Sequence, residues 1–168
     1  MTPIDYARPR FIENQRFTQW WVWAVMIVPA LIAVGTIIYF VAKLSLFSAR
    51  LHMLLLTLAI PLAVPALFFV MRLNIVLTSQ HLTARFFPMR RRIELSDMTS
   101  FRAITYTLRD FGGWGIKWAR DGSLVLNVSG NRAIRINRRS GKSLILGTQR
   151  ADDFAAALEE LGITREPD

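Results

Sequence analysis

The sequence predicts a two-helix membrane hairpin joined to a small α+β domain. Residues 17–42 and 51–71 contain no Asp, Glu, Lys or Arg, and at about 1.5 Å per residue helices of these lengths can cross a hydrocarbon core of roughly 30 Å. The remaining chain changes to short apolar–polar alternations separated by turn residues, and then to one amphipathic segment. The expected organisation is a polar N-terminal flank (1–16), a transmembrane hairpin (17–72, with spans at about 19–42 and 51–71), a soluble domain (73–163) and a tail (164–168).

The charges around the two apolar segments predict their orientation in the membrane. Three arginines precede the first segment, two cations lie in the short loop, and a larger basic group follows the second segment. Because cytoplasmic flanks carry an excess of Lys and Arg, both termini are expected in the cytoplasm. The first apolar run is too long to be a cleaved signal peptide, and no small-residue cleavage motif follows it. We therefore expect an integral membrane protein with a cytoplasmic soluble domain.

The soluble domain is expected to contain about seven short strands. Apolar and polar residues alternate well along residues 100–108, and the three later turns, Asp121-Gly122, Ser129-Gly130-Asn131 and Ser140-Gly141, contain residues that tolerate positive φ. The expected strands are 74–79, 82–87, 100–108, 116–120, 124–128, 133–137 and 143–146, with 91–94 as a further candidate.

A C-terminal helix is predicted over residues 151–161. Apolar residues recur there at helical spacing, Asp152 and Asp153 suit the positive N-terminal end of a helix, and Gly162 suits its close. Strands followed by one amphipathic helix predict a bent antiparallel sheet or small barrel that the helix closes. Phe154 and Leu158 are the helix residues expected in its core.

Four sequence strings carry a resemblance to a known group of proteins. They are Glu13-Asn14-Gln15-Arg16-Phe17 with Gln19-Trp20-Trp21, Phe111-Gly112-Gly113-Trp114-Gly115-Ile116, Val128-Ser129-Gly130-Asn131-Arg132 and Leu146-Gly147-Thr148-Gln149-Arg150. With the hairpin and the closing helix, they resemble an uncharacterised family of short bacterial membrane proteins with a pleckstrin-homology-like (PH-like) domain. The resemblance implies a PH-like fold and a place in the bacterial inner membrane. It implies no activity and no ligand-binding residue.

Basic residues are concentrated in the middle of the soluble domain. Residues 85–142 contain thirteen Lys or Arg against four acidic residues, whereas residues 143–168 contain two against six. Basic surface beside a membrane attracts anionic headgroups, and a solvated basic face that only enforces topology is the alternative. Nucleic acid is not expected as a partner, because no nucleic-acid motif is present. The candidate contacts to the lipid surface are Arg90, Arg91, Arg92, Arg135, Arg138, Arg139 and Lys142.

The sequence offers little for catalysis or metal binding. The chain has no cysteine and two histidines, and the predicted topology places His52 and His81 on opposite sides of the membrane. Neither histidine has a second one at ligand spacing. No cofactor, metal or catalytic residue is expected, and an enzyme of unknown type is a remote alternative.

Two functions remain. The first is a non-enzymatic binding or assembly module for other membrane proteins or for a second copy of the chain. Its candidate contacts are Trp114, in a glycine-rich bend, and Asn131 and Arg132, at a hairpin tip. The second is a module that binds the anionic lipid surface through the basic residues. Salt sensitivity separates the two, because salt screens surface charge beyond about 8–10 Å and leaves apolar contacts intact.

Overall fold

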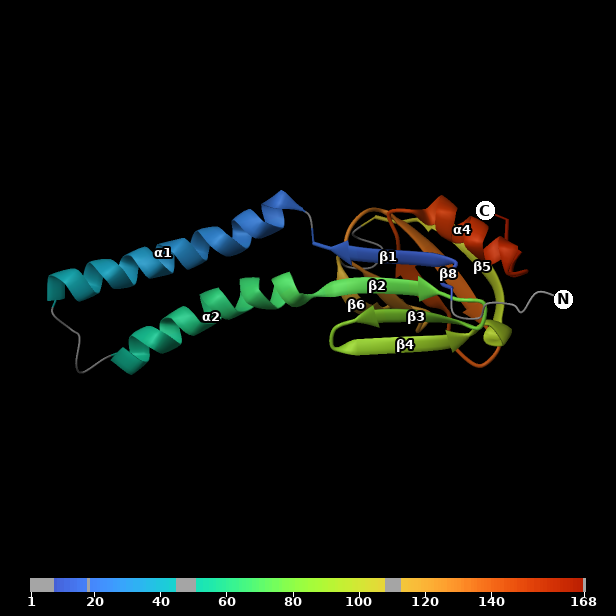
Figure 1. Cartoon of the computed structure of the whole chain (residues 1–168). Helices are drawn as coiled ribbons and strands as arrows, with labels where there is room; N and C mark the ends of the chain where they lie inside the picture. Colours follow the sequence, from blue (N-terminus) through green and yellow to red (C-terminus); the bar gives the residue numbers. More distant parts are fainter. Residues whose placement is uncertain (1–7, 18, 45–50, 108–112, 168) are drawn as a thin grey trace. The chain divides into compact units, whose positions relative to one another are not determined.

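The computed structural model describes residues 8–17, 19–44, 51–107 and 113–167 (Figure 1). The chain divides into two compact units, one formed by residues 17–71 and the other by the segments on either side of it. It is an α+β protein with an apolar N-terminal helix, two sheets and a C-terminal helix.

The helical unit contains α1 (Trp20–Leu44) and α2 (Leu51–Val70). Within the described residues, one stretch is long and apolar enough to cross a membrane, Trp20–Tyr39, with a mean hydropathy of 2.3. A signal sequence near an N-terminus meets the same criteria. Aromatic rings join the start of the unit to its end, since Phe17 lies 5.0 Å from Phe68 between ring centroids. The predicted loop on the far side of the membrane falls largely on residues 45–50, outside the described residues.

The first sheet has four antiparallel strands in the order β1-β2-β3-β4. Alternate residues of β2 and β3 point inward and are fully buried, which is the pattern of a sheet with one face on the core. The strands are β1 (Phe11–Arg16), β2 (Arg72–Leu77), β3 (His81–Phe86) and β4 (Met89–Glu94).

Strand β1 corrects the prediction that residues 1–16 form only a polar flank. It pairs with β2 along its whole length, from Phe11 opposite Leu77 to Arg16 opposite Arg72. Two of its three inward residues, Glu13 and Gln15, are polar although buried. The alternation of hydrophobicity that marks a strand is therefore absent from this segment of the sequence.

The second sheet has six strands in the order β10-β5-β8-β9-β7-β6. Its β7–β9 and β10–β5 pairs are parallel, and its other pairs are antiparallel. The short 3-10 helix η1 (Leu95–Asp97) leads into it from β4. The strands are β5 (Met98–Thr105), β6 (Gly115–Trp118), β7 (Leu124–Asn127), β8 (Arg132–Arg138), β9 (Leu144–Gly147) and β10 (Thr164–Arg165).

Two further predictions about the sheets need correction. The seven expected strands and the 91–94 candidate correspond to β2 to β9, but among the described residues the two sheets do not join into the closed small barrel that was one of the expected forms. The predicted tail begins with β10, which pairs with β5. A two-residue strand carries too little sequence pattern to be recognised.

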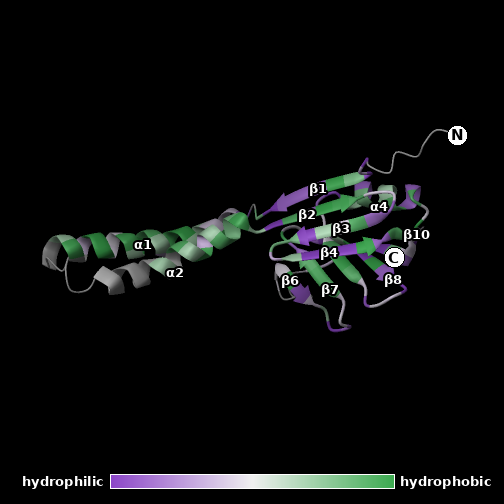
Figure 2. Ribbon diagram, turned by 60° about the horizontal axis from the view of Figure 1, so that its bottom comes forward, coloured by the Kyte–Doolittle hydropathy of each residue, from purple (hydrophilic) through white to green (hydrophobic). Residues whose placement is uncertain are grey.

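The predicted C-terminal helix is confirmed as α4 (Ala151–Glu160). Phe154 and Leu158 are fully buried, and the Phe154 ring stacks on Phe11 of β1 with 4.7 Å between centroids. Figure 2 shows hydrophobic and hydrophilic residues alternating along the strands, as expected where one face of each sheet lies on the core. Helix α4 and strand β1 thus share one part of the core, although about 140 residues separate them.

Candidate functional site

Strand β4 carries the three consecutive arginines as an edge strand. It pairs with β3 alone among the described strands, with Arg90 opposite Arg85 and Arg92 opposite Thr83. Charged side chains on an edge strand hinder pairing with another sheet, so protection of the edge explains part of this charge. All three arginines are exposed, whereas Ile93 is buried beneath them.

A basic pocket lies beside β4. It has a volume of about 250 Å³, and its lining combines Arg91 and Arg92 of β4 with Arg138 and Lys142, which flank the β8–β9 turn. No Asp or Glu lines it. Trp118, at the end of β6, adds an indole that is 66% exposed. The apolar part of the lining comes from Ile93, Leu124 and Leu144.

Two of the four pocket cations are not neutralised. Arg92 forms an ion pair with Glu94 at 3.4 Å, and Arg138 forms one with Asp97 at 2.9 Å. Among the residues that the structure describes, neither Arg91 nor Lys142 has an ion-pair partner. The pocket therefore holds an excess of positive charge that can receive an anionic group.

Asp97 fixes the turn that forms one wall of the pocket. Its carboxylate accepts hydrogen bonds from the Ser140 hydroxyl and the Ser140 backbone N–H, each at 2.8 Å, and from Arg138 Nε at 2.9 Å. The Ser140 hydroxyl, and after it the backbone N–H and Arg138, lower the pKa of Asp97 below its usual value. A second hollow of about 460 Å³ adjoins this turn and includes Arg139.

The structure separates the other predicted lipid contacts from the pocket. Arg135 forms an ion pair with Asp121 and is not among the pocket residues. The backbone N–H of Ser123, and after it the Ser123 hydroxyl and Arg135, lower the pKa of Asp121 to about 2. Arg90 lies toward the opposite end of β4 from Glu94, beside Arg85. Four of the seven predicted lipid-contact residues line the pocket: Arg91, Arg92, Arg138 and Lys142. Arg139 lines the adjoining hollow, and Arg90 and Arg135 line neither.

The predicted partner contacts do not gather into one site. Arg132 donates to both carboxylate oxygens of Asp152 at 2.8 and 2.5 Å, so it holds the start of α4 against β8. The Asn131 carbonyl accepts a hydrogen bond from the Tyr106 backbone at 2.8 Å. Trp114 lies half-buried just before β6. The exposed Trp118 is the aromatic residue of the pocket that the sequence interpretation missed, because one Trp in a four-residue strand does not reveal which face it occupies.

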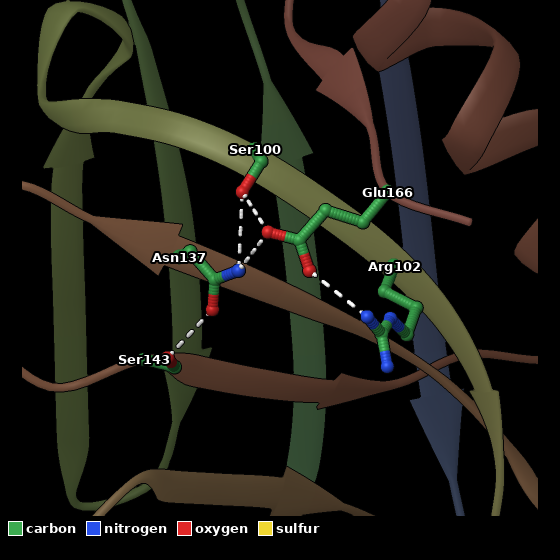
Figure 3. Close-up of polar contacts among 5 residues, drawn as sticks. All are labelled: Ser100, Arg102, Asn137, Ser143 and Glu166. Atoms are coloured by element: carbon green, nitrogen blue, oxygen red, sulfur yellow. Dashed lines mark hydrogen bonds and ion pairs between the residues drawn. The ribbon is translucent and has the colours of Figure 1, made fainter. Parts of the chain in front are cut away.

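A polar network at the opposite edge of the second sheet holds the C-terminal tail (Figure 3). Glu166 Oε1 accepts hydrogen bonds from Ser100 at 2.5 Å and from Asn137 at 2.8 Å, and Arg102 lies 3.4 Å from Oε2. The Ser100 hydroxyl is the largest of the contacts that lower the pKa of Glu166. The network contains no imidazole that could act as a base toward serine. These hydrogen bonds attach the C-terminal tail to β5 and β8.

Within the described ranges, no three His, Cys, Asp or Glu residues are placed to hold a metal ion. No family model matches the chain, and no curated protein or solved structure matches it either.

Proposed function

We propose that this chain is a non-enzymatic integral membrane protein of the bacterial inner membrane, and that its cytoplasmic PH-like domain binds acidic segments of membrane protein partners. The basic pocket beside β4 is the observation that carries this proposal. Two mainly antiparallel sheets followed by a C-terminal helix support the PH-like assignment. The proposal separates into the anchoring of the chain and the chemistry of the pocket.

Pairing of β1 with β2 supports a two-span hairpin. These strands lie immediately before and after residues 17–71, and they are hydrogen-bonded neighbours in one sheet. In the proposed membrane protein this pairing is consistent with both ends of the apolar region on the same side of the membrane, and so with an even number of crossings. A single crossing by α1 would separate β1 from β2. Large apolar side chains on both helices are exposed, as suits contact with lipid, including Leu31 (64%) of α1 and Phe69 (62%) of α2.

Thiol labelling tests the predicted orientation, because the chain has no cysteine. Asn14→Cys and Ala156→Cys place thiols at exposed positions of β1 and α4, and Ser48→Cys places one in the predicted outer loop. In spheroplasts, we expect a membrane-impermeant maleimide to label only Ser48→Cys, and to label the other two after permeabilisation. Labelling of Ala156→Cys without permeabilisation contradicts the orientation. Labelling of Asn14→Cys and Ala156→Cys from different sides contradicts the hairpin.

The place of the pocket along β4, toward the end of the first sheet opposite Arg16 and Arg72, favours a protein ligand over a lipid headgroup. Arg16 and Arg72 mark one end of the first sheet, where the chain leaves β1 and enters β2. Strand β4 runs away from that end, and Asp97 beyond it contacts the turn that carries Ser140. That turn, which also carries Lys142, thus belongs to the end of the first sheet opposite Arg16 and Arg72. Flexible carboxylates of an acidic protein segment can reach a pocket there, with Trp118 available for apolar contact.

A defined acidic peptide tests the pocket chemistry. The full chain is placed in nanodiscs of neutral lipid, and binding of a fluorescein-labelled hexaglutamate peptide is followed by anisotropy. We expect the double variant Arg91→Gln, Lys142→Gln to raise the dissociation constant about tenfold, because each exposed ion pair contributes up to about 1 kcal/mol and about 1.4 kcal/mol corresponds to tenfold.

The matched control removes two cations that do not line the pocket, Arg10→Gln with Arg120→Gln. It should bind the peptide within about twofold of the unmodified chain, since only long-range attraction is reduced. A hexaglutamine peptide should not bind. Equal weakening in the two double variants, or no binding of hexaglutamate at all, contradicts a specific acidic-segment site.

A further inference from the structure

The turn between β3 and β4 presents an exposed aromatic side chain between two arginines. Phe86, the last residue of β3, is fully buried, whereas the neighbouring Phe87 is 51% exposed. Arg85 and Arg90 lie opposite each other in the two strands that lead into the turn, and both are exposed. An apolar ring beside two cations is the combination that binds at the interface of an anionic membrane.

This turn shares an end of the sheet with the chain's connections to the helical unit. Leu73, next to Arg72, is opposite Phe86, so Phe87 lies level with the start of β2. Arg16, at the end of β1, is opposite Arg72. Residues 17–19 alone separate β1 from α1, and Met71 alone separates α2 from β2. Since an extended residue spans at most about 3.6 Å, neither connection can exceed about 15 Å.

We infer that the β3–β4 turn is a second membrane-contact site, at which Phe87 enters the interfacial layer while Arg85 and Arg90 bind anionic lipid headgroups. The inference rests on the proposed membrane anchoring of residues 17–71. It assigns lipid contact to the end of the first sheet at which the chain leaves β1 and enters β2. The pocket toward the other end of β4 stays open to an acidic protein segment. Two of the predicted activities, lipid binding and partner binding, then belong to different ends of one domain.

Lipid-borne quenchers locate the turn in the full chain. Phe87→Cys, labelled with the small fluorophore NBD, reports on the turn, and Ser96→Cys with the same label reports on an exposed position beyond β4. Both proteins are reconstituted in vesicles that contain phosphatidylglycerol and a lipid with a shallow nitroxide. We expect several-fold stronger quenching at residue 87 than at residue 96.

Charge variants test the role of the two arginines. Arg85→Gln with Arg90→Gln should reduce quenching at residue 87 in anionic vesicles and change it little in neutral ones. The pocket variant Arg91→Gln, Lys142→Gln removes the same charge and should leave this quenching unchanged. Flotation of the protein with the vesicles measures anchoring independently of the fluorophore.

Each outcome separates the inference from the proposed function. Loss of flotation shows that the anchoring itself has failed. Flotation without quenching at residue 87, or with equal quenching at residues 87 and 96, overturns the membrane-contact site alone. A blue-shifted emission at residue 87 without lipid quenching also overturns it, because the ring is then buried against protein, such as a second copy of the chain.

Discussion

Replacing Phe154 with alanine is expected to lower the free energy of unfolding of the soluble unit by about 3–5 kcal/mol, the range found for large aromatic residues in protein cores. The ring is fully buried and stacks on Phe11 at 4.7 Å. Its loss leaves a cavity where α4 packs against Phe11 of β1. A unit with a total stability of about 5–15 kcal/mol would lose a large share of it. Urea unfolding of the full chain in an uncharged detergent measures the change.

Ala156→Ser is the matched control for this prediction. Ala156 lies on the exposed face of the same helix, where substitutions usually change stability by less than about 0.5 kcal/mol. If α4 lay on the surface and contributed nothing to the core, Phe154→Ala and Ala156→Ser would unfold at the same urea concentration. That result would remove α4 from the core.

Replacing Glu13 with alanine is expected to lower the free energy of unfolding by about 2–4 kcal/mol, because two hydrogen-bond donors then lose the buried carboxylate that accepts from them. Glu13 is 7% exposed, and its Oε1 accepts a hydrogen bond from the Gln149 backbone N–H at 2.9 Å. Its Oε2 accepts one from the Thr148 hydroxyl. These contacts join β1 to the segment between β9 and α4. The same urea titration measures the loss.

The neighbouring residue provides the control for Glu13. Asn14 is on the exposed face of β1, so Asn14→Ala should alter stability little. Glu13→Gln should fall between the two, since its amide keeps one acceptor oxygen. If Glu13→Ala were as stable as Asn14→Ala, the buried carboxylate would contribute nothing to the attachment of β1.

The regular elements that the sequence predicted share a strong periodic signal. Strands β2 and β3 alternate fully, and α4 places Phe154 and Leu158 on one buried face. Strand β1 has no such signal, because its inward side chains include Glu13 and Gln15, whose partners lie more than 130 residues away. A polar residue that is satisfied only by tertiary contacts looks like surface in the sequence. For the same reason a domain that starts at residue 73 lacks one strand of its first sheet.

The sequence predicted which basic residues are candidates for the site, but it did not predict which of them lie close together. Counting charges identified the arginines of β4 and the cations near Arg138, but strand direction decides which of them meet. Arg91 and Lys142 line the same pocket, whereas Arg135 forms an ion pair with Asp121. The distances between these side chains depend on which distant strands pair, and no local sequence pattern encodes that pairing.

The contacts of Glu13 and Gln15 also bear on the order in which the protein is made. A ribosome adds about 5–20 residues per second, so Gly147 and Thr148, to which these side chains bind, emerge on the order of ten seconds after β1. During that interval the apolar segments, which the proposed function places in the membrane, leave the ribosome directly after β1. Glu13 and Gln15 oppose the entry of β1 itself into lipid, because burial of unpaired polar groups in hydrocarbon is costly. The buried polar contacts of β1 can therefore form only after β9 and the segment that follows it have been synthesised.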